Sequence, residues 1–386
     1  MLYVHIPFCE RKCNYCDFVS FHANYDIIDK YIIKLLSEIE YKSYLAKNYV
    51  ISSIYIGGGT PSLIDKKYVR FIMESIVNNY AVSDDAEITI ESNPNSLNQD
   101  KLNTYYETGI NRLSIGLQSS NDAELKVLGR VHNYNDFLNA YNLAIHTGFK
   151  NINIDLINGI PTQSAESFKK TLKQVMMLNV KHISIYNLII EDNTPFKTML
   201  AENKLTLPLE TELLKMDSIT KELTKYHRLN RYEISNYAKQ GFECKHNLGY
   251  WSDVPYLGFG LNSSSYFDSA RLKNKSNLNN YMRLNYNDYL ITNNKNSYYD
   301  EIRIIDTIEH IREYVMLGFR KTSGININEY KNIFNENFEE RFKSQIKYYQ
   351  SIELLYRNND NYYLSDKGLD VSNRIIADFI NQKGLA

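Results

Sequence analysis

Short apolar runs rich in β-branched residues alternate with longer amphipathic runs over the first two-thirds of the chain. The short runs are typical of buried strands, and the longer runs have the period of about 3.6 residues expected of helices. The expected strands are Leu2–Ile6, Ile51–Ile56, Glu87–Glu91, Arg112–Leu117, Asn151–Leu156 and His182–Leu188. The expected helices are Tyr25–Lys47, Lys66–Asn79, Gln99–Thr108, Tyr134–His146, Ala165–Leu178 and Glu210–Leu229. This alternation predicts an α/β fold whose βα units form a partial or complete parallel barrel.

The pattern changes beyond Leu229. Tyr232–Tyr237 predicts another strand, and residues 271–297, rich in Asn and Lys, predict a mobile connector. The last expected elements are helices Ile302–Leu317, Asn326–Phe334, Phe338–Ser351 and Ser365–Phe379, with a hairpin over 354–364. This order predicts a winged-helix-like module. We therefore expect a barrel over 1–235, a connecting segment over 236–300 and a C-terminal helical domain over 301–386.

Composition and charge indicate an ordinary globular protein. The chain has 386 residues, 43% of them hydrophobic, and a formal net charge of −1. This balance gives no electrostatic basis for binding nucleic acid or an anionic membrane. We expect no transmembrane segment, because no apolar run reaches about 18 residues. Charged residues interrupt any signal-peptide core, and four cysteines are not a disulfide framework, so we expect a cytoplasmic protein.

The strongest chemical signal is the C-x3-C-x2-C spacing of Cys9, Cys13 and Cys16. Thiolates select iron–sulfur clusters, zinc or copper(I). The charged and polar residues between these cysteines suit a loop rather than a core. A structural zinc site normally has four protein ligands, so three cysteines favour a [4Fe–4S] cluster with one iron open to a small molecule. Zinc completed by Cys244 or a distant histidine is the alternative.

Distinctive residues also follow the carboxyl ends of the other expected strands, the rim that carries the active site in parallel βα barrels. They are Gly57–Pro61, Glu91–Pro94, Gln118, Asp155 with Asn158–Pro161, and Leu188–Ile190, and Arg130 lies in the loop after Gln118. Each alone could be a turn, a cap or a solvated charge. Together they indicate a site for a ligand with an amine, a carboxylate and a ribose.

His246 has two interpretations. The more common fate of such a histidine is a hydrogen-bonded place in the core or on the surface. Its neighbours Asn247, Tyr250 and Trp251 permit another, because a histidine flanked by aromatic rings can ligate haem iron.

The run Tyr3–Cys9, with Cys13, Tyr15 and Cys16, resembles the radical SAM enzymes related to oxygen-independent coproporphyrinogen III oxidase. The similarity extends to Gly57–Pro61, Glu91–Pro94, Leu113–Gln118, Arg130, Ile154–Pro161, Tyr232–Asn236 and Glu313–Arg320. Within this family the chain looks most like the HemW-like haem chaperone branch. The oxidase branch has a further cysteine where this chain has Phe18, and an extension before the first strand. His246–Trp251 matches the HNxxYW motif of the chaperone branch, which is implicated in haem contact.

The resemblance implies a radical SAM (β/α)6 partial TIM-like barrel with a smaller C-terminal winged-helix-like domain. It implies that Cys9, Cys13 and Cys16 ligate a [4Fe–4S] cluster whose open iron binds S-adenosylmethionine. The implied S-adenosylmethionine contacts are Tyr3, Gly58, Gly59, Thr60, Glu91, Gln118, Arg130, Asp155 and Ile189, and His246 is implied for haem. One departure is Asn262–Ser265, which stands where relatives have Gly-Ala-His-Ser and puts any role of that missing histidine in doubt.

The implied function is a haem chaperone that passes haem to haem-accepting, respiratory proteins. Peripheral membrane contact and a homodimer stay open. The alternative is an enzyme of porphyrin biosynthesis, which oxidatively decarboxylates coproporphyrinogen III. A DNA-binding regulator is disfavoured, because Asp and Glu balance Lys and Arg in the C-terminal module.

Overall fold

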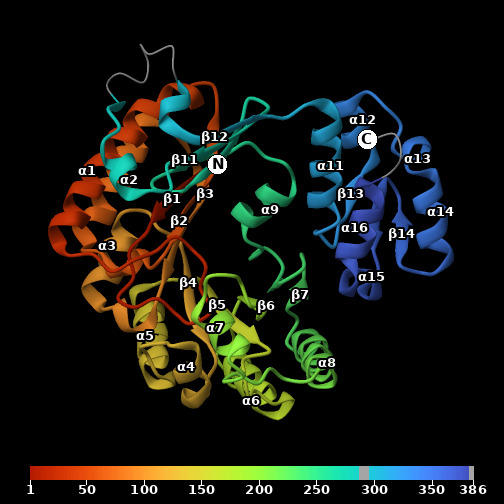
Figure 1. Ribbon diagram of the computed structural model, residues 1–386, viewed down its shortest axis with the longest axis horizontal. Coiled ribbons are helices and arrows are strands. Elements are labelled where there is room, and N and C mark those ends of the chain that lie inside the picture. The colour runs from red at the N-terminus through yellow and green to blue at the C-terminus, as the bar shows by residue number, and fades with distance from the viewer. Residues whose placement is uncertain (287–294, 382–386) are drawn as a thin grey trace.

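The computed structural model describes residues 1–286 and 295–381. Its centre is a parallel sheet of six strands, as predicted from the sequence. They are β1 (Leu2–Ile6), β2 (Val50–Gly58), β3 (Ala81–Ser92), β4 (Arg112–Gln118), β5 (Asn151–Asn158) and β6 (His182–Asn187). Consecutive strands of these six are neighbours, which is the arrangement of a barrel wall. With β7 (Asn230–Arg231), β8 (Asn236–Ala238) and β9 (Leu257–Phe259) the full order of the sheet is β7-β8-β6-β5-β4-β3-β2-β1-β9. The ladder ends at β7 and β9, so the described barrel is partial (Figure 1).

Helices cover the outer side of this sheet (Figure 1). The predicted ones are α1 (Tyr25–Lys42), α2 (Lys66–Asn79), α3 (Gln99–Glu107), α5 (Tyr134–Thr147), α6 (Ala165–Met177) and α8 (Glu210–Tyr226). Most begin where a polar side chain accepts a hydrogen bond from the first turn, such as Asn24, Asp65 and Ser164. No described helix has the length and apolar character that crossing a membrane requires.

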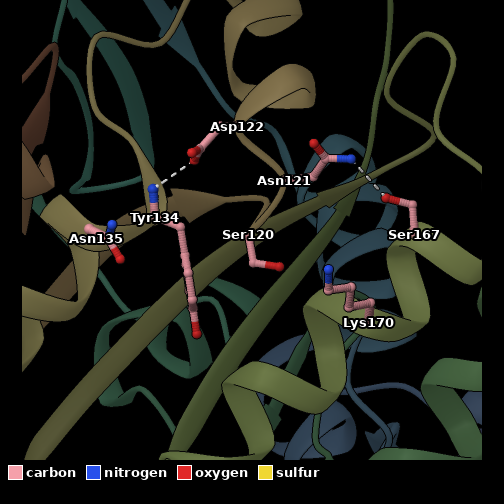
Figure 2. Close-up of a pocket in the computed structure, with 7 residues that line it drawn as sticks. All are labelled: Ser120, Asn121, Asp122, Tyr134, Asn135, Ser167 and Lys170. Carbon is pink, nitrogen blue, oxygen red and sulfur yellow. Dashed lines mark hydrogen bonds between the residues drawn. The ribbon is translucent and has the colours of Figure 1, made fainter.

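Two further helices, α4 (Asp122–Leu128) and α7 (Pro195–Ala201), were not predicted, because seven residues show too little periodicity. Polar contacts hold α4 against its neighbours. Asp122 Oδ1 accepts a hydrogen bond from Tyr134 N at the start of α5, at 2.9 Å. Asn121 donates to Ser167 Oγ of α6 at 3.2 Å (Figure 2). The start of this short helix is therefore joined to the first turns of α5 and α6.

Residues 230–259 add three short strands to the barrel sheet. β7 (Asn230–Arg231) and β8 (Asn236–Ala238) run antiparallel at one end, and β9 (Leu257–Phe259) lies parallel to β1 at the other. The predicted strand Tyr232–Tyr237 is therefore wrong over its first part. The chain bends there, and Ser235 N donates to Glu233 Oε1 at 2.9 Å. Helix α9 (Lys245–Trp251) precedes β9.

A second sheet joins β10 (Ser264–Phe267), β11 (Ala270–Asn274) and β12 (Tyr299–Ile304), with α10 (Leu278–Met282) between the last two. The predicted mobile connector 271–297 thus contains a strand and a helix, and its residues 287–294 lie outside the described part. The predicted helix Ile302–Leu317 starts too early. Residues 299–304 pair with β11, and the helix α11 (Thr307–Gly318) begins after Asp306, whose side chain accepts from Glu309 N at 2.8 Å.

The C-terminal domain has its own apolar core, which includes Phe319, Tyr330, Phe342 and Phe379. Its other helices are α12 (Ile327–Phe334), α13 (Phe338–Arg341), α14 (Lys343–Ser351), α15 (Asp366–Asp370) and α16 (Ser372–Ile380). Its strands β13 (Ile325–Asn326), β14 (Leu355–Asn358) and β15 (Asn361–Leu364) form a small sheet in the order β13-β15-β14. The predicted helical domain with a hairpin is confirmed. The division at residues 235 and 300 stays a prediction.

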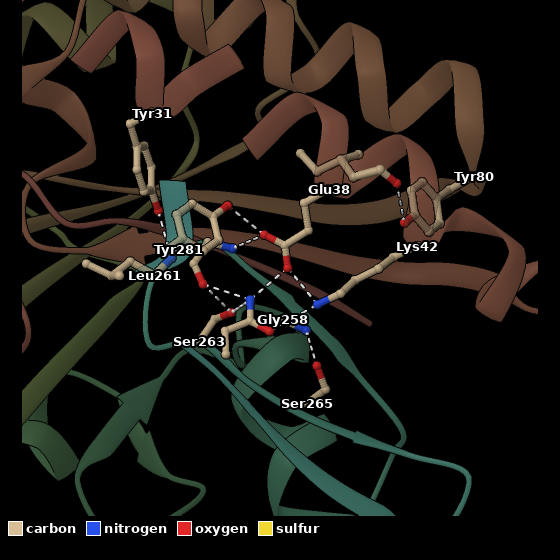
Figure 3. Close-up of polar contacts among 12 residues, drawn as sticks. Tyr31, Glu38, Lys42, Tyr80, Gly258, Leu261, Ser263, Ser265 and Tyr281 are labelled. Atoms are coloured by element: carbon tan, nitrogen blue, oxygen red, sulfur yellow. Dashed lines mark hydrogen bonds and ion pairs between the residues drawn. The ribbon is translucent and has the colours of Figure 1, made fainter. Parts of the chain in front are cut away.

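A buried ion pair fastens β9 and the following loop to α1 (Figure 3). Glu38 Oε1 lies 2.6 Å from Lys42 Nζ, and neither side chain is more than 1% exposed. Glu38 Oε2 accepts from Gly260 N at 2.9 Å and from Tyr281 O–H at 2.7 Å. Because every charge in this cluster is paired, burial does not leave an isolated ion. The network holds β9 beside β1, the strand that leads into the cysteine loop.

Candidate functional site

A cavity of about 400 Å³ opens at the carboxyl ends of the parallel strands, the rim at which the sequence predicts a site. Apart from Tyr3 and His246, every predicted site residue lines this cavity. They are Cys9, Cys13, Cys16, Gly58, Gly59, Thr60, Glu91, Gln118, Arg130, Asp155 and Ile189. The structure therefore brings together residues that lie up to 180 positions apart in the sequence (9 to 189).

Asn14 anchors the cysteine loop. Its backbone N donates to Leu128 O, and its side-chain amide donates to Val127 O, both at 2.9 Å. Its carbonyl accepts from Phe196 N, also at 2.9 Å. The loop is therefore clamped between the end of α4 and the start of α7. These contacts hold the loop through Asn14 and do not involve a cysteine thiol.

The three cysteines are placed to share one metal centre. All three are free and half-buried, and they line one cavity. Zinc–sulfur bonds of about 2.3 Å would bring three thiols to roughly 4 Å from one another. Among the described residues, no three Cys, His, Asp or Glu side chains converge closely enough to hold one metal ion. Three free thiols that face one cavity suit an iron–sulfur cluster, which cysteine thiolates hold.

The zinc alternative finds no support in this geometry. Cys244 directly precedes α9 and is fully buried. Its Sγ donates to Glu87 Oε1 at 3.2 Å, and burial raises the pKa of this thiol to about 12. Neither Cys244 nor His246 lines the cavity that holds the other cysteines. We therefore interpret Cys244 as a structural thiol.

The glycine turn after β2 lies directly against the cysteine loop. Gly58 has a φ of +120°, and a Cβ there would lie 2.8 Å from the His5 ring. A Cβ on Gly59 would lie 2.8 Å from Phe8 O and 2.9 Å from Cys9 Sγ. Thr60 N donates to Phe8 O at 2.8 Å, and Thr60 Oγ1 lies 3.5 Å from Cys9 Sγ. Only a chain without side chains at these glycines can approach the first cysteine this closely.

Two carboxylates face the cavity from β3 and β5, the strands on either side of β4. Glu91 accepts from Tyr55 O–H at 2.9 Å and from Gly58 N at 3.1 Å. Burial raises the pKa of Glu91 to about 7, although both hydrogen bonds oppose this change. Asp155 accepts from Ser114 Oγ at 2.9 Å and from Asn153 at 2.7 Å, and burial raises its pKa as well. These oxygens can accept hydrogen bonds from hydroxyl or ammonium groups of a ligand.

Arg130 supplies the positive charge of the site. Its Nη1 lies 3.7 Å from Cys13 Sγ, and its Nη2 donates to Gly116 O at 2.8 Å and to Asn93 Oδ1 at 2.6 Å. Asn93 also donates to Thr60 Oγ1 at 3.0 Å, so it joins the glycine turn to Arg130. Gln118 ends β4 with a φ of +69°, which turns the chain at the cavity wall. Arg130 therefore places a positive charge beside the cysteine loop.

Sequence reasoning missed Tyr55 and Asn93 as site residues. Asn93 lies within the unusual run at the end of β3, so its position carried a signal. Tyr55 points inward because inward and outward side chains alternate along β2. That alternation would have identified it together with Ser53 and Gly57.

The mouth of the cavity is apolar and flanked by basic residues. Phe18 is 62% exposed and Ile189 is 65% exposed, and both line the cavity. Arg11 and Lys12, which are exposed, also line it. This mouth combines apolar surface with positive charge.

Tyr3 and His246 lie beside the cavity rather than in its lining. Tyr3 lines an adjoining groove of about 310 Å³, which shares Phe18 with the cavity, and its ring stacks on Tyr55 at 6.3 Å. His246 is 1% exposed, with Nδ1 2.9 Å from Ser53 Oγ. Burial lowers the pKa of His246 to about 3, and its Nε2 has no hydrogen-bond partner among the described residues. Its role toward haem stays a prediction.

A separate polar cleft of about 420 Å³ lies on the outer surface between α4, α5 and α6 (Figure 2). None of the predicted site residues lines it. Its Asn121 and Asp122 side chains already bind backbone N–H groups at helix starts. We therefore place the functional site at the barrel rim.

A partial barrel with three cysteines in the loop after its first strand defines a radical SAM protein. In agreement, residues 3–175 match the Radical SAM superfamily, and residues 305–371 match the HemN C-terminal domain. The chain is 32% identical to "Heme chaperone HemW" of Bacillus subtilis (strain 168), over 98% of this chain and 99% of that protein. It is also 32% identical to "Heme chaperone HemW" of Haemophilus influenzae, over 99% and 98%. The chain therefore belongs to the HemW family of radical SAM proteins.

The solved structure of coproporphyrinogen III oxidase (HemN) from Escherichia coli is similar to the whole chain. Its TM-score is 0.83, with 98% of this chain and 89% of that chain covered. The identity is 23%, so this likeness shows the shared fold alone. Membership of the radical SAM superfamily implies a [4Fe–4S] cluster and S-adenosylmethionine as cofactors.

Proposed function

We propose that the protein is a haem chaperone, which binds haem and delivers it to haem-accepting proteins, respiratory proteins among them. The observation that carries the proposal is similarity to "Heme chaperone HemW" proteins over 98% of the chain. Phe18 supports it, because this position beside the cysteine loop carries no thiol.

Cys9, Cys13 and Cys16 would hold the [4Fe–4S] cluster. When bound, the cluster supplies one electron for reductive chemistry on S-adenosylmethionine. The cavity of about 400 Å³ lies within the range of about 300–1,000 Å³ that small-molecule sites occupy. Its narrow, partly apolar walls would limit the access of water to both cofactors.

Different polar side chains of the cavity contact different groups of S-adenosylmethionine in this proposal. Glu91 and Asp155 accept hydrogen bonds from the ammonium and ribose hydroxyl groups, and Arg130 attracts the carboxylate. Gly58, Gly59 and Thr60 let the ligand approach the backbone beside Cys9. Tyr3, Gln118 and Ile189 complete the proposed contacts: Gln118 and Ile189 do so from the wall, and Tyr3 from the adjoining groove.

The mouth of the cavity suits haem, which is a flat apolar ring with two carboxylates. Phe18 and Ile189 offer apolar surface for the ring, and Arg11 and Lys12 offer charge for the carboxylates. His246 is buried, so ligation of the iron by His246 requires α9 to move.

Hemin titration of the purified protein tests this function. We expect saturable binding with a shifted Soret band in the wild type, and a loss or shift of that band in His246→Ala. His227→Ala is the matched control, because this histidine lies at the end of α8, away from the cavity, and its substitution should change nothing. An unchanged Soret band and stoichiometry in His246→Ala would remove His246 as a ligand. The absence of saturable binding to the wild type would refute the proposal.

A second assay separates the chaperone from the enzyme. The anaerobically reconstituted, reduced protein is incubated with S-adenosylmethionine and coproporphyrinogen III. A chaperone leaves the porphyrinogen unchanged. Formation of protoporphyrinogen would show that the oxidase activity named for the structural neighbour also belongs to this chain.

A further inference from the structure

An unbroken chain of hydrogen bonds crosses the barrel interior from α9 to the cavity. Cys244 N, directly before α9, donates to Tyr232 Oη at 3.2 Å, and Tyr232 Oη lies 2.7 Å from His182 Nε2. His182 Nδ1 lies 2.6 Å from Asn153 Oδ1, and Asn153 Nδ2 donates to Asp155 Oδ1 at 2.7 Å. Every member before Asp155 is at most 8% exposed.

The direction of each hydrogen bond follows from the chemistry of the partners. A carboxylate only accepts, so the Asn153 amide must turn its nitrogen toward Asp155 and its oxygen toward His182. His182 Nδ1 then carries the proton and donates. Its Nε2 accepts from Tyr232 O–H, and the Tyr232 oxygen accepts from Cys244 N–H. The network thus defines one tautomer of His182 and one orientation of Asn153.

His182 stays neutral in this position. It is fully buried, and burial lowers its pKa well below the usual value, with the nearby Arg112 cation adding to this effect. A neutral imidazole has one donor and one acceptor, which is what this place in the network requires.

The carboxylate at the end of the chain is held on both oxygens. Asn153 donates to Oδ1, and Ser114 Oγ donates to Oδ2 at 2.9 Å. Asn153 Nδ2 also donates to Ser114 Oγ at 2.7 Å. The Asn153 amide therefore binds one carboxylate oxygen directly and also holds the serine that donates to the other. Ser184 Oγ donates to Asn153 Oδ1 at 3.1 Å, a longer contact than that of His182.

We propose that His182 is a positioning residue for the ligand of the cavity. Through Asn153 it orients the Asp155 carboxylate, and through Tyr232 it ties that carboxylate to Cys244, the residue directly before α9. This inference rests on the proposed role of Asp155 in binding S-adenosylmethionine. It adds a physical link between the cavity and α9, the helix that carries His246 and Trp251. The position of α9 and the affinity of the cavity for S-adenosylmethionine therefore depend on each other.

The test measures the dissociation constant of S-adenosylmethionine on the anaerobically reconstituted protein by equilibrium dialysis. Iron content and thermal midpoint are measured in parallel. His182→Leu removes both ring nitrogens, and we expect about tenfold weaker binding, the effect of losing a hydrogen bond that supports a charged group. His182→Asn retains a donor near the Nδ1 position and should recover most of this loss. A general folding defect would not be repaired by this smaller polar residue.

Tyr232→Phe tests the link to α9 with a milder change, because the ring and its packing remain. We expect weaker binding of S-adenosylmethionine and, in hydrogen–deuterium exchange, loss of the ligand-induced protection of α9. Tyr80→Phe is the matched control. It removes another buried tyrosine hydroxyl, which donates to Ile39 O at 2.8 Å, and should leave both measurements unchanged.

Asp155→Asn separates this inference from the proposed function. Weaker binding in Asp155→Asn with wild-type binding in His182→Leu would overturn the positioning role alone. Wild-type binding in Asp155→Asn would overturn the proposed role of Asp155 and the inference with it. Equal losses in His182→Leu and His182→Asn would also overturn the positioning role.

Discussion

Gly59→Ala offers a direct test of how the glycine turn shapes the cluster site. The added Cβ would lie 2.8 Å from Phe8 O and 2.9 Å from Cys9 Sγ, inside the ordinary contact distance of about 3.5–4.0 Å. Phe8 O cannot retreat easily, because it accepts the hydrogen bond from Thr60 N that joins the turn to the cysteine loop. Cys9 must therefore move away from the position it needs as a ligand.

The expected penalty follows from the cost of overpacking, which is about 1–3 kcal/mol. If the penalty falls on the bound state, cluster affinity falls roughly 5- to 150-fold. We expect the reconstituted variant to hold less than half of the wild-type iron and sulfide, and to lose much of its absorbance in the visible range. The apo protein should melt within a few degrees of the wild type, because the thiol can shift when no cluster is bound.

Gly57→Ala is the control for the same substitution two residues earlier. Its Cβ would meet the side chains of Glu91 and Tyr55 at 3.0 Å, and no cysteine atom is among its nearest neighbours. This variant should retain the cluster and bind S-adenosylmethionine more weakly. Wild-type iron content in Gly59→Ala, or an equal loss of iron in both variants, would refute this account of the turn.

Three further predictions concern charged groups. The pKa of Glu91 is about 7, so the ionised fraction of this side chain rises from roughly one tenth at pH 6 to nine tenths at pH 8. Because the ionised carboxylate is the proposed acceptor, the affinity for S-adenosylmethionine should rise up to about tenfold over this range. Equilibrium dialysis should show a flatter pH profile in Glu91→Gln, and parallel profiles would contradict the assignment. Glu38→Ala leaves the Lys42 ammonium buried without its partner carboxylate. Denaturant unfolding should therefore show that the free energy of unfolding falls by about 3–5 kcal/mol, and a fall below about 1 kcal/mol would contradict this. His310→Ala removes the partner of Asp253 Oδ2, 2.5 Å away, and with it a contact between α11 and the segment that joins α9 to β9. Trypsin should therefore release the C-terminal part of the chain faster, and an unchanged cleavage rate would show that this contact does not hold it.

The barrel and most of its rim were predictable because they depend on local signals. A run such as Leu2–Ile6 has the length and composition of a buried strand, and parallel strands place their carboxyl ends on one edge. The cysteine spacing and the glycine run therefore indicated a shared site before any contact was known. The match between predicted and observed strands reflects this local periodicity.

The remaining features depend on contacts between distant segments. Helix α9 has only seven residues and contains Gly249, so its sequence does not show a helical period. The end of β12 was assigned to a helix, because Ile302 and Ile304 fit either pattern until β11 pairs with them. His182 and Asn153 resemble ordinary polar strand residues. Only the adjacency of β5 and β6 reveals that they support Asp155.

The place of β1 in the sheet has a consequence for the order in which the protein is made. β1 carries the cysteine loop and is among the first elements synthesised, yet its outer neighbour β9 consists of Leu257–Phe259. At about 5–20 residues per second, that edge of β1 waits on the order of tens of seconds for its partner. An unpaired edge is a template for pairing with other chains. During this interval the strand that carries the cysteine loop has an unpaired edge. The nascent chain is therefore open to aggregation at this edge, and to binding there by chaperones that prevent aggregation.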